Sequence, residues 1–236
     1  METLQTIGRH IEKTDAIIVD LDKTLVKGRV AEGLGLWYLN REWNNHDYGK
    51  VATGVIGIAK IKFLLRKFKG KDTAEAKGIK LFYDALIKTG IGEKTEMQEC
   101  ALKYFKENTI EQVGEIVRFA SKPKFLATIA GSTASQVAVG HFKLDGFTSN
   151  IDLFDSDNGR FKLKGIEILI GDGNQKLEAV EKMLRVRGIS LKNCTAIGDG
   201  LPDIPLLRTA GFSIASPFAT DAVRAITKIQ LEGAKK

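Results

Sequence analysis

The sequence of 236 residues is poor in cysteine and has no long apolar segment, and both absences exclude classes of protein. Its two cysteines, Cys100 and Cys194, lie too far apart along the chain for a metal-binding motif, so we predict two free thiols in a reducing compartment. No uninterrupted apolar run reaches the roughly 18 residues that a membrane span requires. The first residues do not lead from a basic stretch into an apolar one, as a signal peptide would. The sequence therefore predicts a cytoplasmic protein without a membrane partner.

The chain carries a formal charge of +7, which favours anionic partners. Lysine and arginine form no stripe interleaved with aromatic residues, so nothing beyond net charge supports a nucleic acid partner. Small anionic substrates explain the charge more simply. The content of 43% hydrophobic and 28% charged residues is that of an ordinary globular protein, long enough for a core domain that carries a smaller one. Nothing in the sequence predicts an oligomeric state.

Short apolar runs predict a parallel sheet built from both ends of the chain. The runs lie at 16–19, 125–130, 195–198 and 212–215. Helical patterns at 176–187 and 217–229 separate the later runs, and strands that alternate with helices are typical of an α/β fold with helices on both faces.

The stretch between the first two runs has helical patterns and little strand signal. These patterns lie near 30–43, 51–68, 73–88, 93–107 and 109–119. We predict an α/β core domain of residues 1–28 and 122–236, with a helical cap domain of residues 29–121 inserted after the first strand. Further on, the turn Asp155-Ser156-Asp157-Asn158-Gly159 lies between apolar flanks. It favours a β-hairpin over a calcium loop, because the distal glutamate of such a loop is missing.

The pentapeptide Asp20-Leu21-Asp22-Lys23-Thr24 follows the first apolar run. Its two carboxylates therefore lie at the carboxyl end of a predicted buried strand, where parallel α/β sheets place their ligands. Buried carboxylates repel each other unless they hold a cation or share a proton. A solvated acidic turn is the alternative, and the pentapeptide alone does not decide between the two.

Charged residues in the C-terminal half favour a buried site at Asp20 and Asp22 over a solvated acidic turn. Lys176 begins an amphipathic helix, where its charge opposes the helix dipole unless an anion lies nearby; a plain surface lysine is the alternative. Asp199 follows the apolar run at 195–198 and again lies at a strand end. Asp203 follows a proline suited to a first helical turn, so a structural role accounts for Asp203 better than for Asp199.

A fourth segment, Ala130-Gly131-Ser132-Thr133, ends a predicted strand and opens a helix. Free backbone N–H groups at such a helix start could hold phosphate oxygens. Ser132 or Thr133 could equally serve only as an N-cap.

Together these segments resemble the haloacid dehalogenase (HAD) superfamily, in particular its phosphoserine-phosphatase-like branch. The matching motifs are Asp20-x-Asp22-x-Thr24 (first), Lys176 (third) and Gly198-Asp199-x-x-x-Asp203 (fourth). The helical insertion and the hairpin fit the same branch. The resemblance implies a Rossmann-like parallel sheet with a helical-bundle cap, and a Mg²⁺-dependent phosphatase of small phosphorylated metabolites.

The resemblance also implies roles. Asp20 would be the nucleophile that becomes an aspartyl phosphate, and Asp22 the general acid and then the general base. Mg²⁺ would lie among Asp20, the backbone carbonyl of Asp22 and Asp199. Lys176 would neutralise the phosphoryl oxygens, and Asp203 would orient Lys176 or a metal-bound water. Separately, the Thr24 hydroxyl would donate to Asp20 or to the turn.

Two positions depart from the family pattern. The strand end places Ala130 where the second motif has Ser or Thr, so Ser132 or the backbone from Gly131 onward would bind phosphate instead. Arg29 falls where phosphoserine phosphatases carry a glutamate that holds the amino group, and Glu32 could serve only after a loop rearrangement. A cationic Arg29 favours a second anionic group on the substrate.

These departures keep other functions open. Ala130 is compatible with a catalytically weakened phosphate-binding or interaction protein. A phosphotransferase that passes the phosphoryl group to an alcohol is a further alternative.

Overall fold

A computed structural model describes residues 4–52, 55, 74–88 and 92–232. These residues include a seven-stranded sheet in the order β4-β3-β2-β1-β5-β6-β7. The strands are β1 (Ala16–Val19), β2 (Lys124–Gly131), β3 (Gly146–Asp157), β4 (Arg160–Glu167), β5 (Cys194–Gly198), β6 (Phe212–Ala215) and β7 (Ile229–Gln230). Neighbouring strands are parallel except for β3 and β4, which pair antiparallel.

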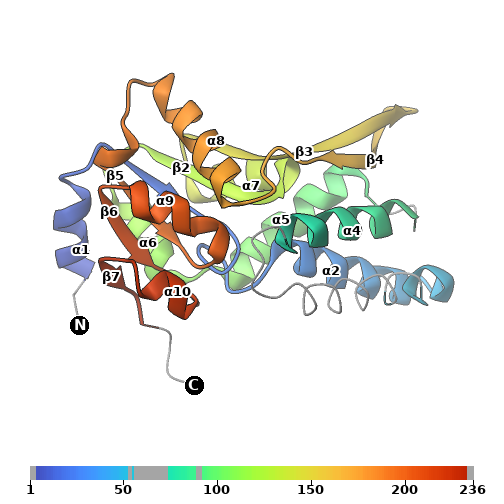
Figure 1. Cartoon of the computed structure of the whole chain (residues 1–236). Helices are drawn as coiled ribbons and strands as arrows, with labels where there is room; N and C mark the ends of the chain where they lie inside the picture. Colours follow the sequence, from blue (N-terminus) through green and yellow to red (C-terminus); the bar gives the residue numbers. More distant parts are fainter. Residues whose placement is uncertain (1–3, 53–54, 56–73, 89–91, 233–236) are drawn as a thin grey trace.

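The described helices form two groups, those that belong with the sheet and those inserted between β1 and β2 (Figure 1). The helices that belong with the sheet are α1 (Leu4–Ile11), α7 (Ser132–Phe142), α8 (Gly173–Arg185), α9 (Ile204–Thr209) and α10 (Asp221–Arg224). The helices inserted between β1 and β2 are α2 (Val30–Asn44), α4 (Ala74–Lys88), α5 (Lys94–Asn108) and α6 (Glu111–Phe119). The predicted fold, a Rossmann-like parallel sheet with a helical insertion after its first strand, is confirmed.

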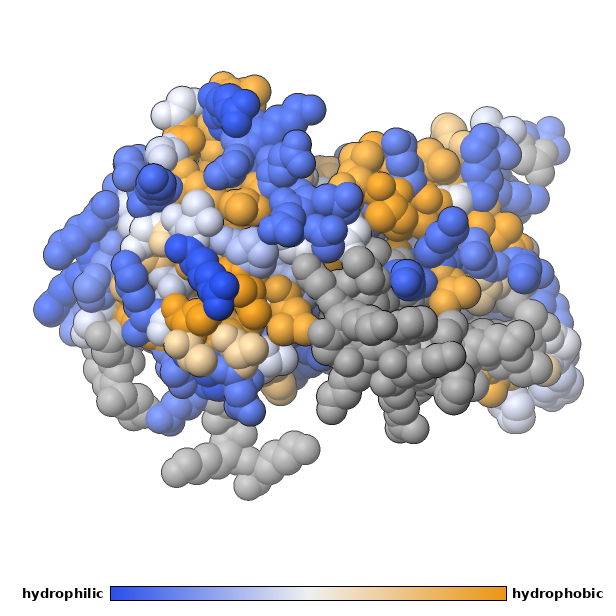
Figure 2. All heavy atoms as spheres, viewed as in Figure 1, coloured by the Kyte–Doolittle hydropathy of each residue, from blue (hydrophilic) through white to orange (hydrophobic). Residues whose placement is uncertain are grey.

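Strand β1 lies at the centre of the sheet because all four of its side chains are apolar and buried. Ile17 and Val19 pack in the same cluster as residues of α1, α6 and α7, whereas Ile18 packs with residues of α8 and α9. Alternate residues of a strand point to opposite faces, so this division places helices on both sides of the sheet. Figure 2 shows mainly hydrophilic side chains on the exposed side of α8, whose residues Val180 and Leu184 are buried against the sheet.

The β3–β4 hairpin extends from the sheet over the inserted helices (Figure 1). Its turn residues Asn158 and Gly159 both have positive φ, at 50° and 78°, as a two-residue hairpin turn requires. The backbone N–H of Leu163 in β4 donates to the carbonyl of Gly92, just before α5, at 2.9 Å. The hairpin thus ties the sheet to the insertion.

Two predictions remain without a test. The helix predicted at 51–68 falls almost wholly outside the described residues. The division into a core domain and a cap domain, with bounds at residues 29 and 121, stays a prediction. Both cysteines are buried free thiols.

In the part of the chain that the structure describes, no helix combines the length and the apolar character needed to cross a bilayer.

Candidate active site

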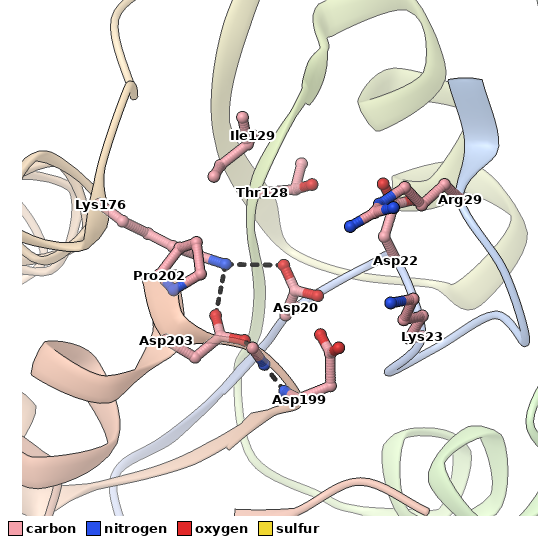
Figure 3. Close-up of a pocket in the computed structure, with 11 residues that line it drawn as sticks. Asp20, Asp22, Lys23, Arg29, Thr128, Ile129, Lys176, Asp199, Pro202 and Asp203 are labelled. Carbon is pink, nitrogen blue, oxygen red and sulfur yellow. Dashed lines mark hydrogen bonds and ion pairs between the residues drawn. The ribbon is translucent and has the colours of Figure 1, made fainter. Parts of the chain in front are cut away.

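Four charged side chains from distant parts of the chain meet at the carboxyl edge of the sheet (Figure 3). Asp20 follows β1 and Asp199 follows β5, which is the neighbour of β1 in the sheet. Lys176 comes from the first turns of α8, and Asp203 from the short 3₁₀ helix Leu201–Asp203. All four line one pocket.

Lys176 lies between two carboxylates. Its Nζ atom is 2.6 Å from Oδ1 of Asp20 and 2.6 Å from Oδ1 of Asp203. Only 1% of the residue is exposed, which excludes a plain surface lysine. Burial alone would lower the pKa of Lys176, but the two carboxylates raise it above its ordinary value and keep the ammonium charged. The carboxylates therefore offset the unfavourable position of a cation near a helix start.

Asp203 is fully engaged in holding other groups. Besides Lys176, it accepts hydrogen bonds at Oδ2 from the backbone N–H groups of Asp199 (2.9 Å) and Gly200 (3.0 Å). A Cβ atom at Gly198 would lie 2.6 Å from the carboxyl carbon of Asp203, so glycine is required there. Asp203 thus positions Lys176 and the turn that carries Asp199.

Asp20 is 6% exposed. Burial raises its pKa to about 8; Lys176 acts in the opposite direction, and the charges of Asp203 and Asp22 act with burial. A divalent cation at this position would favour the ionised carboxylate.

Carboxylate oxygens of Asp20, Asp199 and Asp203 lie within 4.8 Å of one another, so the group can hold a metal ion. Hard oxygen ligands suit Mg²⁺ or Ca²⁺. Because both oxygens of Asp203 already accept hydrogen bonds, Asp20 and Asp199 fit a cation better than Asp203 does.

Comparison with known proteins agrees with this arrangement. Residues 141–236 match the family model described as haloacid dehalogenase-like hydrolase. Solved phosphoserine phosphatases share the fold over almost the whole chain. A substrate-bound complex has 20% identity and a TM-score of 0.63 over 93% of both chains. A phospho-aspartyl intermediate analogue has 20% identity and a TM-score of 0.61 over 94% of this chain and 95% of that one. Residues 141–236 are therefore similar to haloacid dehalogenase-like hydrolases, and the chain shares the fold of solved phosphoserine phosphatases.

Further relatives agree with this family. A phosphoserine phosphatase of Albidiferax ferrireducens is 36% identical over 63 residues, a stretch that spans 27% of this chain and 26% of that relative. A HAD family hydrolase of Salmonella enterica serovar Typhi shares the fold with a TM-score of 0.65 and 17% identity, over 92% of this chain and 67% of that one. The chain thus resembles phosphoserine phosphatases in fold, and in sequence over about a quarter of its length.

The insertion holds Asp22, the second carboxylate of the segment that follows β1. Oδ1 of Asp22 accepts a hydrogen bond from the backbone N–H of Val30, the first residue of α2, at 2.9 Å. The N-cap residue Arg29 makes no side-chain hydrogen bond to the start of α2. Asp22, eight residues before Val30, accepts a hydrogen bond from the helix start instead and so caps the helix. Figure 3 shows Asp22 and Arg29 on the opposite side of the pocket from Lys176. Sequence reasoning did not find this contact, because the cap comes from outside the helix.

Thr128 is a pocket residue that sequence reasoning missed. The parallel register pairs Val19 with Leu126, so the next positions, Asp20 and Ala127, are level, and Thr128 follows directly. Thr128 lines the pocket and its hydroxyl accepts from the N–H of Ala130 at 3.1 Å. The sequence did contain a signal for this, because the apolar run of β2 is longer than that of β1. Strand β2 continues to Gly131, past the end of β1, so a residue before its end can lie level with the residues that follow β1.

The predicted phosphate-binding positions Gly131 and Ser132 are not brought to this pocket. The Ser132 hydroxyl accepts from the backbone N–H of Asp152 at 3.0 Å, and the N–H of Thr133 donates to the Asp152 carboxylate at 2.7 Å. The start of α7 therefore caps onto a residue of β3. A Cβ atom at Gly131 would collide with the side chains of Asp152 and Tyr83, which accounts for the glycine.

Three remaining predicted residues differ in position. Arg29 lines the pocket, and its guanidinium lies 3.8 Å from Glu32. Glu32 lies on α2, is 48% exposed and is not part of the pocket wall. The Thr24 hydroxyl is buried in the turn that follows β1, with no hydrogen-bond partner among the described residues, so the predicted donation to Asp20 is not formed.

Proposed function

We propose that the protein is a Mg²⁺-dependent phosphatase of small phosphorylated metabolites that acts through an aspartyl phosphate at Asp20. The observation that carries the proposal is the buried Lys176, held at 2.6 Å from both Asp20 and Asp203. A charged lysine beside a carboxylate at the carboxyl edge of a parallel sheet creates a place for an anion next to a nucleophile.

The residues carry the reaction in two steps. An Asp20 carboxylate oxygen forms a bond to phosphorus while the bond from phosphorus to the leaving oxygen breaks, and Asp22 gives that oxygen its proton. Water then attacks phosphorus, Asp22 takes a proton from the water, and the bond from Asp20 to phosphorus breaks. Both carboxyl groups return to their starting states and inorganic phosphate leaves.

Positive charge lets two anions approach each other in the first step. Asp203 holds Lys176 in place before the reaction. Lys176 therefore needs no reorganisation when the equatorial oxygens of the phosphoryl group gain charge. Thr128 lies where its hydroxyl can donate to a phosphoryl oxygen. A Mg²⁺ ion held by Asp20, Asp199 and the backbone carbonyl of Asp22 would supply further charge to screen the carboxylate from the phosphate.

The inserted helices act in this proposal as a cap that excludes water and reads the leaving group. Arg29 joins the pocket to the first of these helices, so the preferred substrate is a phosphomonoester with a second anionic group. Phosphoserine phosphatases are the fold relatives, and phosphoserine carries both a carboxylate and an ammonium; Arg29 suits the carboxylate only.

An activated aryl phosphate tests the reaction class. We expect Mg²⁺-dependent phosphate release that a chelator or Asp20→Asn abolishes. Asp155→Asn is the matched control, because Asp155 is 67% exposed on the hairpin and pairs only with exposed Lys164 in the described structure. Absence of turnover above background across a broad panel of phosphate esters would refute the proposal. Product analysis with added glycerol separates hydrolysis from phosphotransfer to an alcohol.

A metabolite panel tests the substrate class. We expect Arg29→Ala to lower the activity towards phosphomonoesters that carry a carboxylate or second phosphate more than it lowers the activity towards the aryl ester, which has no second anionic group. Thr128 lines the pocket and could take the role of the Ser or Thr that Ala130 replaces, which supports the phosphatase over a weakened phosphate-binding protein.

A further inference from the structure

A second cavity, of about 350 Å³, lies among the end of α5, the start of α6 and the end of α7. It shares no residue with the pocket around Asp20. One wall is Lys124, the first residue of β2, which belongs to the opposite end of the parallel strands from Asp20. Its volume falls in the range of pockets that bind small molecules, roughly 300–1,000 Å³.

The lining of this cavity is strongly cationic. The four residues with permanent positive charge are Lys106, Arg118, Lys124 and Lys143. Glu111 is the one carboxylate in the lining, which leaves an excess of three positive charges. Within the described part of the chain, Lys106, Arg118 and Lys143 form no ion pair, and the Lys124 ammonium reaches only the carbonyl of Ala120, at 3.4 Å.

Helix dipoles explain only part of this gathering. Lys106 lies in the last turn of α5 and Arg118 in the last turn of α6, where cations are favourable. Lys143 is the C-cap residue of α7, where a cation is favourable as well. Lys124 is the first residue of β2, so no helix end accounts for its charge. Like charges that converge on one cavity repel each other, and a bound anion would turn that repulsion into attraction.

The start of α6 adds to the positive potential. Its N-cap residue, Ile110, offers no side-chain cap to the first backbone N–H groups. Both Glu111 and Gly114 of this first turn line the cavity. A helix start with uncapped N–H groups favours an anion, and here it meets four cationic side chains.

His141 provides a sensor inside this cavity. Its ring packs against those of Phe105 (6.1 Å between centroids) and Phe142 (4.7 Å). Burial lowers the pKa of His141, and the charges of Lys106 on α5 and Arg118 on α6 lower it further. An anion that cancels those charges will raise it again.

We propose that this cavity binds a small anion with two or more phosphate groups, such as an oligophosphate or a polyphosphorylated metabolite. Three excess charges match such an anion better than a monoanion. Arginine and lysine together are the side chains that recognise phosphate. A cavity of about 350 Å³ has room for a compact ligand but not for an extended nucleic acid strand. The proposal is independent of the phosphatase reaction.

The test is an NMR titration of the imidazole signals in the intact protein with inorganic tripolyphosphate, without metal and at constant ionic strength. The chain has three histidines, so His10 and His46 serve as internal controls. We expect a saturable shift of the His141 signal and a rise of its pKa. A parallel titration with sodium chloride serves as the reference. The signals of His10, which stacks on Phe212, and of His46 should shift with tripolyphosphate no more than they do in that reference.

Two double variants with the same charge change locate the site. Lys106→Gln with Arg118→Gln should weaken tripolyphosphate binding by about tenfold or more. Lys182→Gln with Arg185→Gln on α8 should leave it unchanged; all four side chains are exposed, and equal melting temperatures will show that the fold is intact. The proposal is overturned by a His141 signal that never saturates, by equal weakening in both variants, or by tighter binding of a single-stranded oligonucleotide than of tripolyphosphate.

Discussion

Replacing Lys176 with methionine removes the one cation that two buried carboxylates share. Asp203 keeps two backbone N–H donors, at 2.9 and 3.0 Å, and so retains hydrogen-bonded partners. Asp20 loses a partner at 2.6 Å while it stays buried. Removing one member of a buried ion pair costs about 3–5 kcal/mol, because the remaining charge is left uncompensated. We expect the loss in the free energy of unfolding to approach this size above pH 8, where Asp20 is ionised in the unmodified protein.

The loss should shrink as the pH falls. Lys176 is the main group that lowers the pKa of Asp20, so in the variant Asp20 binds a proton more readily and avoids a buried, unpaired charge. A protonated Asp20 is no nucleophile, and the cation that faces the phosphate is gone as well. We therefore also expect phosphatase activity to fall by at least ~100-fold.

Urea unfolding at about pH 7 and about pH 9.5, on either side of the Asp20 pKa of about 8, measures the stability effect, and aryl phosphate turnover measures the effect on activity. The control is Lys164→Met, which breaks the exposed pair with Asp155 and should cost less than about 1 kcal/mol at either pH. If Lys176→Met costs no more than this control, or keeps its activity, then the buried ion pair has neither the stabilising nor the catalytic role proposed for it.

Three further predictions concern the same pocket. Val30→Pro removes the N–H that holds Asp22 but keeps a residue tolerated at a helix start; stability should fall by about 1 kcal/mol because Val30 is buried, kcat of the folded protein should fall about tenfold, and full kcat would contradict the placement of Asp22 by α2. Thr128→Val should lower kcat/KM at least about tenfold through one lost hydrogen bond to phosphate, whereas Ser132→Ala should not; the reverse order would place phosphate at α7. In the metal-free protein Asp20 has a folded pKa of about 8 against an ordinary 3.8, so its contribution to stability is complete below pH 4 and declines towards pH 8; urea unfolding should show this decline, and Asp20→Asn should remove it.

Short motifs predicted the sheet and the edge at which the charged residues meet. Buried apolar runs require strands, and parallel strands bring their carboxyl ends together, so Asp20 and Asp199 could be placed as neighbours without coordinates. The catalytic roles of these two carboxylates stay predictions until the reaction is measured.

Positions that depend on partners distant in sequence were not predictable. The end of the second apolar run was used to place Ala130 at the position of the family's Ser or Thr. In the structure β1 ends where it pairs with Leu126, so Thr128 rather than Ala130 lines the pocket with Asp20. Ser132 was assigned to phosphate, but the carboxylate of Asp152, twenty residues later, occupies the start of α7. Neither register nor such a tertiary cap can be read from local periodicity.

The central place of β1 has a consequence for how the protein is made. Ile17 pairs with Lys124 on one side and with Thr195 on the other. Both partner strands are synthesised long after β1, so β1 has no sheet neighbour while the ribosome adds the intervening chain. Until then four consecutive apolar residues expose two unpaired edges, a template for pairing with other chains. Any truncation before β5 leaves one edge of β1 open permanently and removes Asp199, so such fragments of this protein should aggregate rather than retain partial activity.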